Sequence, residues 1–129
     1  MREILFRGKS THNGEWHYGW LTYSKFHNAY EITDGNGVYN FVDPDTVGQY
    51  TGLQDKNGTK IFDDDLLYYR NSNHDEEDGT MEVVLEEGAF MIAGDILVPL
   101  HETYSWELEV VGNIYDNPEL LEGWNAKRD

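Results

Sequence analysis

The stretch GQYTGLQDKNGTKIFDDDLL, from Gly48 to Leu67, is compatible with two architectures. Its aspartates and its central glycine suit either a metal-binding loop or two strands joined by a tight turn. In the calcium-loop register that places Gly58 at the sixth position, Asp55 and Asn57 occupy the third and fifth ligand positions. The first position falls on Leu53, which has no side-chain oxygen, so the calcium register fails.

A hairpin explains the same residues, because Asn57 and Gly58 both tolerate a positive φ. We therefore predict a turn at Asp55 to Gly58 with no bound metal. The flanking segments Gln49 to Leu53 and Lys60 to Tyr69 are predicted to pair as antiparallel strands.

The run Asp63 to Asp65 offers a second chemical interpretation, as a magnesium site for metal-assisted hydrolysis. Neighbouring residues of a strand point to opposite faces, so only Asp63 and Asp65 could converge on one ion. A third ligand would have to come from elsewhere, with His74, His101 and Glu102 as candidates. A solvated turn leading into a strand is the simpler reading, and we predict no metal and no catalytic residues here.

The phosphate-binding loop also fails as an assignment. Gly8, Lys9 and Ser10 form its GKS tripeptide, but Glu3 stands where the loop requires its first glycine. The five histidines are scattered without metal-ligand spacing on any predicted helix, and no pattern typical of a nucleophilic serine occurs. We accordingly predict no enzyme activity and no cofactor.

Composition limits the partners that this chain can bind. The 129 residues contain nine Lys and Arg against 25 Asp and Glu, a formal net charge of -16, which opposes direct binding to nucleic acid or to an anionic membrane. The hydrophobic fraction of 39% and the 18 aromatic residues (four Trp, nine Tyr and five Phe) predict a folded domain. There is no cysteine, no signal-peptide pattern and no run of membrane-spanning length, which fits a soluble protein of the cytoplasm.

Glycines recur throughout the chain between short runs rich in Val, Ile, Tyr, Phe and Trp, a pattern typical of many short strands. The fold class is therefore mostly β, with very short helices at Asp43 to Thr46 and Asn117 to Gly123. The segment Asn71 to Thr80 has no large apolar side chain and is predicted to be an exposed loop. The other predicted strands are Arg2 to Lys9, Glu15 to Ser24, Ala29 to Thr33, Val38 to Val42, Met81 to Leu85, Phe90 to Ala93, Ile96 to Leu100 and Trp106 to Tyr115.

Alternation along Glu15 to Ser24 places Trp16, Tyr18 and Trp20 on one face of a strand. Such aromatic side chains can stack on bases or sugars, but the negative charge favours a packed face or a contact between subunits. We predict Trp16, Tyr18 and Trp20 as a self-association site.

Several segments, in order along nearly the whole chain, resemble the YopX family. The matching segments are Met1 to Lys9, Gly14 to Trp16, Tyr18 to Gly19, Val42 to Leu53, Asp55 to Gly58 and Val110 to Leu121. One departure is Asp63 to Asp65, because members of the family commonly have a Glu-Gly-Asp step at this place. The missing glycine puts an identical turn in doubt.

The resemblance implies a protein carried by bacterial phages and prophages, from a family with no established biochemical activity and no catalytic residues to carry over. It further implies coiled antiparallel sheets, a C-terminal SH3-like barrel and a homo-oligomer. We expect a single domain over residues 1–129, with an N-terminal hairpin region at 1–47 and the SH3-like barrel at 48–129.

We expect the protein to be non-enzymatic and to act by binding a phage or host protein or by self-assembly. Two alternatives remain. One is an acidic decoy that imitates nucleic acid toward a basic protein, and the other is the metal-dependent hydrolase at Asp63 to Asp65.

Overall fold

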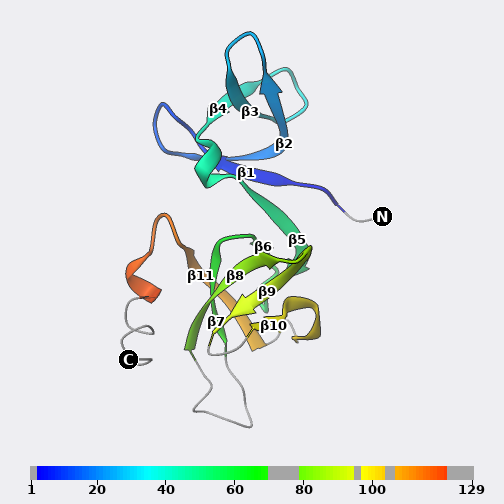
Figure 1. Ribbon diagram of the computed structural model, residues 1–129, viewed down its shortest axis with the longest axis vertical. Coiled ribbons are helices and arrows are strands. Elements are labelled where there is room, and N and C mark those ends of the chain that lie inside the picture. Colours follow the sequence, from blue (N-terminus) through cyan, green and yellow to red (C-terminus); the bar gives the residue numbers. More distant parts are fainter. Residues whose placement is uncertain (1–2, 70–78, 95–96, 104–106, 122–129) are drawn as a thin grey trace. The chain divides into compact units, whose positions relative to one another are not determined.

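The computed structural model describes residues 3–69, 79–94, 97–103 and 107–121, which form antiparallel strands and very short helical segments. The chain divides into two compact units, Met1–Gly52 (unit 1) and Leu53–Asp129 (unit 2) (Figure 1). Each unit is described by itself below.

Unit 1 is built from four short strands and the first part of a fifth. Their hydrogen-bonded order is β4-β3-β2-β1-β5, and β5 continues across the boundary of the units to pair with β6 of unit 2. The elements are β1 (Phe6–Lys9), β2 (Trp16–Ser24), β3 (Ala29–Thr33), β4 (Tyr39–Val42), the 3₁₀ segment η1 (Pro44–Thr46) and β5 (Gly48–Gln54).

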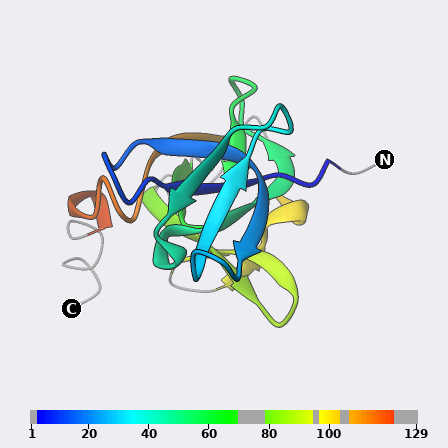
Figure 2. The ribbon, with the colours of Figure 1, turned by 90° about the horizontal axis from the view of Figure 1, so that it is seen from above.

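Strand β2 changes its partner halfway along. It pairs with β1 over Trp16 to Gly19 and with β3 over Trp20 to Ser24, and the ribbons of unit 1 are correspondingly twisted (Figure 2). Gly19 stands at the change of partner, where a Cβ atom would lie 2.1 Å from the backbone oxygen of Thr33. The bend of β2 therefore requires glycine at this position.

The core of unit 1 lies on one face of its sheet, where Ile32 and Val42 are buried. Val42 packs so closely over Gly8 that a Cβ atom there would come within 3.0 Å of the Val42 Cβ. The turn after β4 forms as predicted, because the Asp43 carboxylate accepts from the amide of Asp45 at 3.0 Å and Pro44 begins η1.

Unit 2 contains a five-stranded antiparallel sheet in the order β10-β9-β8-β7-β11, together with β6. The elements are β6 (Lys60–Phe62), β7 (Asp65–Tyr69), β8 (Gly79–Glu86), β9 (Ala89–Ala93), β10 (Leu97–Pro99), the 3₁₀ segment η3 (Leu100–Glu102) and β11 (Leu108–Asn113). These strands and η3 bury a common apolar core, whose members are Ile61, Leu67, Val83, Ile92, Leu100 and Leu108.

The mostly β fold class is confirmed, but two details of the prediction are wrong. The single strand expected over Lys60 to Tyr69 is two strands, β6 and β7, because the turn predicted at Asp63 to Asp65 separates them. Strand β8 already begins at Gly79, inside the expected loop. In the part of the chain that the structure describes, the unit 2 sheet ends in two edge strands, β10 and β11, and no closed barrel is found. The SH3-like barrel stays a prediction.

Five predicted segments lie partly outside the described residues: the strands Arg2 to Lys9, Ile96 to Leu100 and Trp106 to Tyr115, the loop at Asn71 to Thr80 and the helix at Asn117 to Gly123. Of the loop at Asn71 to Thr80, only Gly79 and Thr80 are described, and of the helix at Asn117 to Gly123, residues 119–121 are helical while 122 and 123 are not described. The Asn117 carbonyl accepts from the amide of Leu120 at 3.1 Å, which agrees with a helical turn at that place.

We predict that Gly19→Ala destabilises the protein by about 2 kcal/mol or more, because the added Cβ would overlap the Thr33 carbonyl and β2 would have to shift. Urea unfolding followed by tryptophan fluorescence measures this change. Gly94→Ala is the matched control, since the atoms nearest to its Cβ would belong to the side chain of Met81, which can move. Equal unfolding midpoints for Gly19→Ala and wild type would show that the bend does not need glycine.

Candidate functional site

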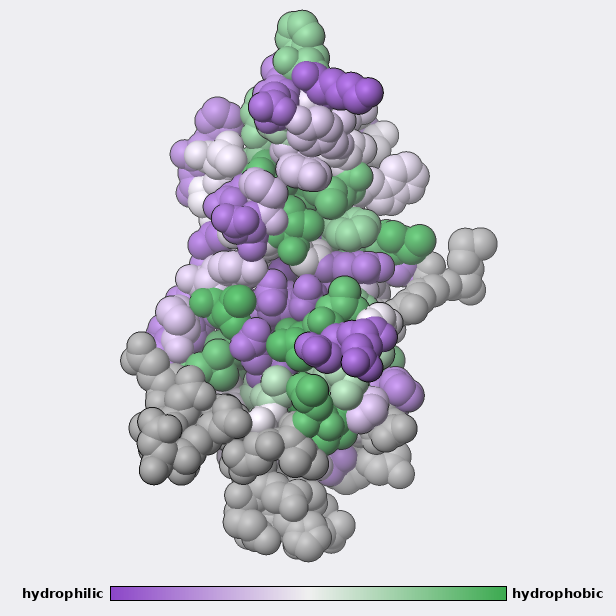
Figure 3. Space-filling view, viewed as in Figure 1, coloured by the Kyte–Doolittle hydropathy of each residue, from purple (hydrophilic) through white to green (hydrophobic). Residues whose placement is uncertain are grey.

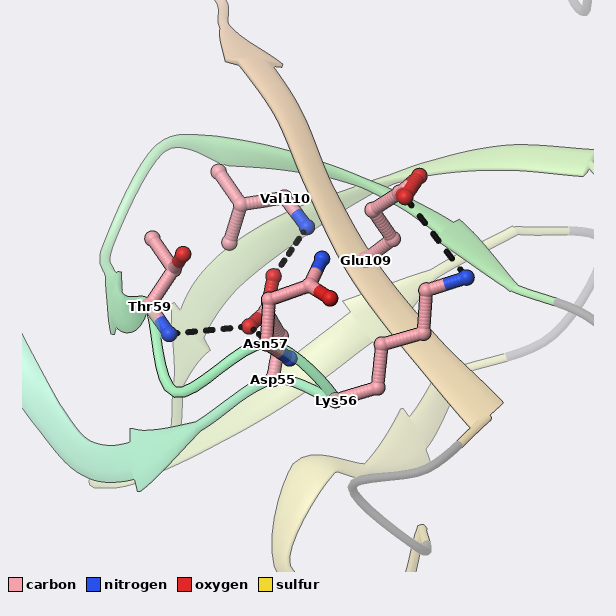
Figure 4. Close-up of polar contacts among 6 residues, drawn as sticks. All are labelled: Asp55, Lys56, Asn57, Thr59, Glu109 and Val110. Atoms are coloured by element: carbon pink, nitrogen blue, oxygen red, sulfur yellow. Dashed lines mark hydrogen bonds and ion pairs between the residues drawn. The ribbon is translucent and has the colours of Figure 1, made fainter.

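The Asp55 carboxylate, which would be a ligand in the rejected calcium-loop register, is bonded to backbone amides (Figure 4). Its Oδ1 accepts from the amides of Asn57 at 2.8 Å and Thr59 at 2.9 Å, and its Oδ2 accepts from the amide of Val110 at 2.8 Å. The residue is 5% exposed. Both carboxylate oxygens are therefore engaged by the protein itself, and we call this set of bonds the Asp55 clamp.

The Asp55 clamp joins the predicted turn to β11. The Gly58 amide donates to the Asp55 carbonyl at 3.0 Å, which closes the turn with Gly58 at φ 81°. The Lys56 amide donates to the Leu108 carbonyl at 3.1 Å. The Lys56 Nζ also lies 3.6 Å from Glu109 Oε1. Both side chains are well exposed, so this ion pair adds little to the stability of the fold.

The three carboxylates of Asp63 to Asp65 are placed by a tight turn. Asp64 has φ 72°, the left-handed conformation that aspartate tolerates better than most residues, and this explains how the turn forms without glycine. Its Oδ2 accepts from the Tyr115 hydroxyl at 2.7 Å. The buried Asp65 accepts from the Phe62 amide at 2.7 Å. Asp64 and Asp65 thus accept hydrogen bonds from different donors.

Glu82 is a described group whose pKa is clearly shifted. It lies on β8 opposite Leu66 of β7, and it is half-buried. Burial raises the pKa of Glu82 above its ordinary value of 4.5, and the nearby Asp64 carboxylate raises this pKa further.

Over residues 3–69, 79–94, 97–103 and 107–121, no group of three or more His, Asp or Glu side chains is arranged to hold a metal ion. Of the candidate third ligands, His101 is exposed in η3. His74 and the side chain of Glu102 lie outside what the structure describes.

Ser24, His27 and Glu31 form a serine–histidine–carboxylate cluster that the sequence analysis did not single out. The Ser24 hydroxyl lies 3.1 Å from His27 Nδ1, and Glu31 Oε1 lies 3.6 Å from the same nitrogen. A catalytic relay needs the serine and the carboxylate on opposite nitrogens of the ring. This cluster therefore has the geometry of a hairpin end and not that of a triad.

Exposed aromatic side chains of unit 1 form the strongest candidate interface. Trp20 pairs with Thr33, and Thr33 pairs with Tyr39, so these three side chains share one face of the sheet. Trp20 is 66% exposed and Tyr39 is 60% exposed, whereas Thr33 between them is buried. We call Trp20 and Tyr39 the aromatic surface.

The three residues predicted for self-association differ in their surroundings. Trp16 is half-buried beneath Arg7, whose Cζ lies 4.6 Å from the ring centroid, and Lys9 lies at 5.7 Å. Tyr18 and Trp20 are exposed. Tyr39 was not predicted, because its place on the same face as Trp20 follows only from the register of β2, β3 and β4. Phe26, which is 92% exposed between β2 and β3, was not predicted either.

The negative charge is divided unequally between the units. Unit 1 contains four Lys and Arg and six Asp and Glu, and unit 2 contains five and 19, so that the net charges of -2 and -14 make up the -16 of the chain. On the face of the molecule in Figure 3, apolar side chains reach the surface among hydrophilic ones in both units. The aromatic surface therefore belongs to the nearly neutral unit.

The described segments contain no helix that is long and apolar enough to cross a membrane.

The fold and these sites define an acidic all-β protein of two compact units, with carboxylates bonded to its own turns and aromatic side chains exposed on one sheet. The sequence profile described as YopX protein matches residues 5–122, and the chain belongs to the YopX family.

Two solved structures resemble the chain over almost their whole length. Protein EF1440 from Enterococcus faecalis is 24% identical, with a TM-score of 0.61 over 94% of this chain and 99% of that chain. Protein yopX from Bacillus subtilis is 17% identical, with a TM-score of 0.62 over 93% of this chain and 98% of that chain. These likenesses establish a shared fold. A comparison with curated proteins gives no match.

We predict that Asp55→Ala destabilises the protein by about 3 kcal/mol, because the amides of Asn57, Thr59 and Val110 lose a charged acceptor. Asp55→Asn should destabilise the protein less, since the remaining side-chain oxygen can still accept a hydrogen bond from a backbone amide. Guanidinium unfolding measures both variants. An Asp55→Ala protein as stable as wild type would mean that these three bonds contribute nothing to folding.

We predict that Glu82→Gln stabilises the protein at pH 7.5 by up to about 1 kcal/mol, since water screens a half-exposed carboxylate. A carboxyl whose pKa is raised by folding favours the folded state below its unfolded pKa and loses that contribution as the pH rises through the folded pKa. The advantage of Glu82→Gln should therefore disappear below pH 4.5. Unfolding at several pH values tests this, with Glu86→Gln on the same strand as control. An advantage that persists at low pH would contradict the assignment.

Proposed function

We propose that this protein is non-enzymatic and acts by binding another protein or by assembling with itself through the aromatic surface of unit 1. The observation that carries the proposal is the exposure of Trp20 and Tyr39 on one face of a sheet. Tryptophan and tyrosine are enriched at protein interfaces, where they bury a large apolar area and keep one polar group hydrogen-bonded.

The distribution of charge supports contact through this unit. A whole-chain charge of -16 opposes association, but only -2 of it belongs to unit 1. Salt screens exposed charges over about 8 Å at physiological ionic strength, whereas burial of apolar area at roughly 25 cal/mol per Å² does not depend on screening. Association through Trp20 and Tyr39 is therefore favourable at moderate salt.

The absence of cysteine supports a role in the bacterial cytoplasm, and the resemblance to a phage-borne family supports a phage or host protein as partner. An SH3-like path of the strands in unit 2 remains part of the proposal.

A decoy function is the second candidate, and the charge of unit 2 favours it. With 19 of the 25 acidic residues, this unit could present carboxylates to a basic protein in place of phosphates. Binding of that kind weakens steeply with added salt, whereas binding through the aromatic surface does not. The salt dependence of binding to a captured partner separates the two.

The hydrolase alternative has less support. Asp64 and Asp65 accept hydrogen bonds from Tyr115 and from the Phe62 amide, so their carboxylates already hold the turn and the start of β7 together. A magnesium ion at this place would compete with these hydrogen bonds for the carboxylate oxygens.

We predict that the wild-type protein has a mass above 15.0 kDa by light scattering in 0.15 M salt, and that Trp20→Lys lowers this mass toward 15.0 kDa. Trp20 is preferred to Trp16, because Trp16 packs against Arg7 within the chain. Leu85→Lys is the matched control, since Leu85 is also about half-exposed, lies in unit 2, and gives the same net charge when replaced.

If Trp20→Lys and Leu85→Lys lower the mass equally, the added charge and not the loss of the aromatic side chain causes the dissociation. A wild-type protein that stays at 15.0 kDa when concentrated would rule out self-association.

A further inference from the structure

The chain contains three Asn-Gly pairs, and one of them differs from the others in its hydrogen bonds. The pairs are Asn13-Gly14, Asn36-Gly37 and Asn57-Gly58. All three glycines have a positive φ and no heavy atom within 4 Å of the place where a Cβ would lie, so steric access does not separate them. What separates them is the state of the glycine amide.

An Asn-Gly pair can deamidate without an enzyme. The backbone nitrogen of the glycine loses its proton and attacks the side-chain carbonyl carbon of the asparagine, and ammonia leaves as a five-membered succinimide forms. Water then opens the ring at either carbonyl and yields aspartate or isoaspartate. The overall change consumes one water and releases one ammonia. A glycine amide that donates a hydrogen bond is a poorer nucleophile, because that bond must be broken before the proton is lost.

Two of the three amides are held. The Gly14 amide donates to the Ser10 carbonyl at 3.0 Å, and the Asn13 side chain is also held, because its Oδ1 accepts from the Glu15 amide at 3.0 Å. The Gly58 amide donates to the Asp55 carbonyl at 3.0 Å, within the turn that the Asp55 clamp stabilises.

The third pair lies in the connection between β3 and β4. The Asn36 amide donates to Asp34 Oδ1 at 2.8 Å and the Gly35 amide donates to Thr33 Oγ1 at 3.1 Å, so the turn is ordered up to Asn36. Within the described residues, neither the Gly37 amide nor the Asn36 side chain makes a hydrogen bond, and both residues are exposed.

We propose that Asn36 is a site of spontaneous deamidation in the folded protein, and that Asn13 and Asn57 are protected by their turns. The modification adds one negative charge to unit 1, whose net charge is only -2. The isoaspartate product also inserts one backbone atom into the connection between Thr33 and Tyr39, which lie in one row of the aromatic surface. The inference does not depend on the proposed function.

The test is incubation of the full chain at pH 8 and 37 °C, followed by proteolysis and mass spectrometry. Deamidation raises the mass of a peptide by about 1 Da, and fragmentation identifies the residue. In the folded protein we expect Asn36 to be modified about fivefold faster, or more, than Asn13 and Asn57, the factor that the loss of one hydrogen bond corresponds to.

The matched control is the same incubation in 8 M urea, in which all three pairs should react at similar rates because each is followed by glycine. Asn36→Gln should abolish the modification at this position in the folded chain. The proposal is overturned if Asn13 or Asn57 reacts as fast as Asn36 in the folded protein, or if the preference for Asn36 persists unchanged in urea.

Discussion

The Asp55 carboxylate is the interaction on which the arrangement of unit 2 depends. One buried side chain accepts three backbone amide bonds, two from its own turn and one from Val110, which lies 55 positions later in the chain. A buried carboxylate without partners would be costly, and a buried amide without an acceptor would be costly as well. The Asp55 clamp satisfies both requirements together, so the aspartate that suggests a metal loop in the sequence is an architectural residue.

Local sequence signals predict the parts of the fold that depend on local chemistry. Asn57 and Gly58 specify a turn through their tolerance of positive φ, and Asp43 with Pro44 specifies a short helical turn. The turn at Asp63 to Asp65 was predicted, but the same residues were also placed inside one strand from Lys60 to Tyr69, because an aspartate carries a weaker signal for the left-handed conformation than a glycine does. The bond between Asp55 and Val110 could not be predicted, since it depends on β7 and β11 being paired first.

In the candidate interface too, local sequence predicts some residues, and others follow only from the pairing of strands. Alternation places Trp20 on a strand face, but only the register of β2, β3 and β4 puts Tyr39 on that face. Alternation also groups Trp16 with Trp20, whereas Arg7 stacks on Trp16. Buried carboxylates stabilise turns in unit 2, and aromatic side chains are exposed in unit 1, which is the observation behind the proposed contact with proteins.

The most direct test of this account is an NMR titration with Ca²⁺ and Mg²⁺ that follows the amide resonances of Asn57, Thr59 and Val110. If the Asp55 carboxylate belongs to its three amides, these resonances keep their positions at millimolar concentrations of either ion, while carboxylates on the surface give weak, unsaturated shifts. Saturable shifts of all three amides at micromolar Ca²⁺ would mean that Asp55 exchanges its amides for a cation, and they would contradict the account.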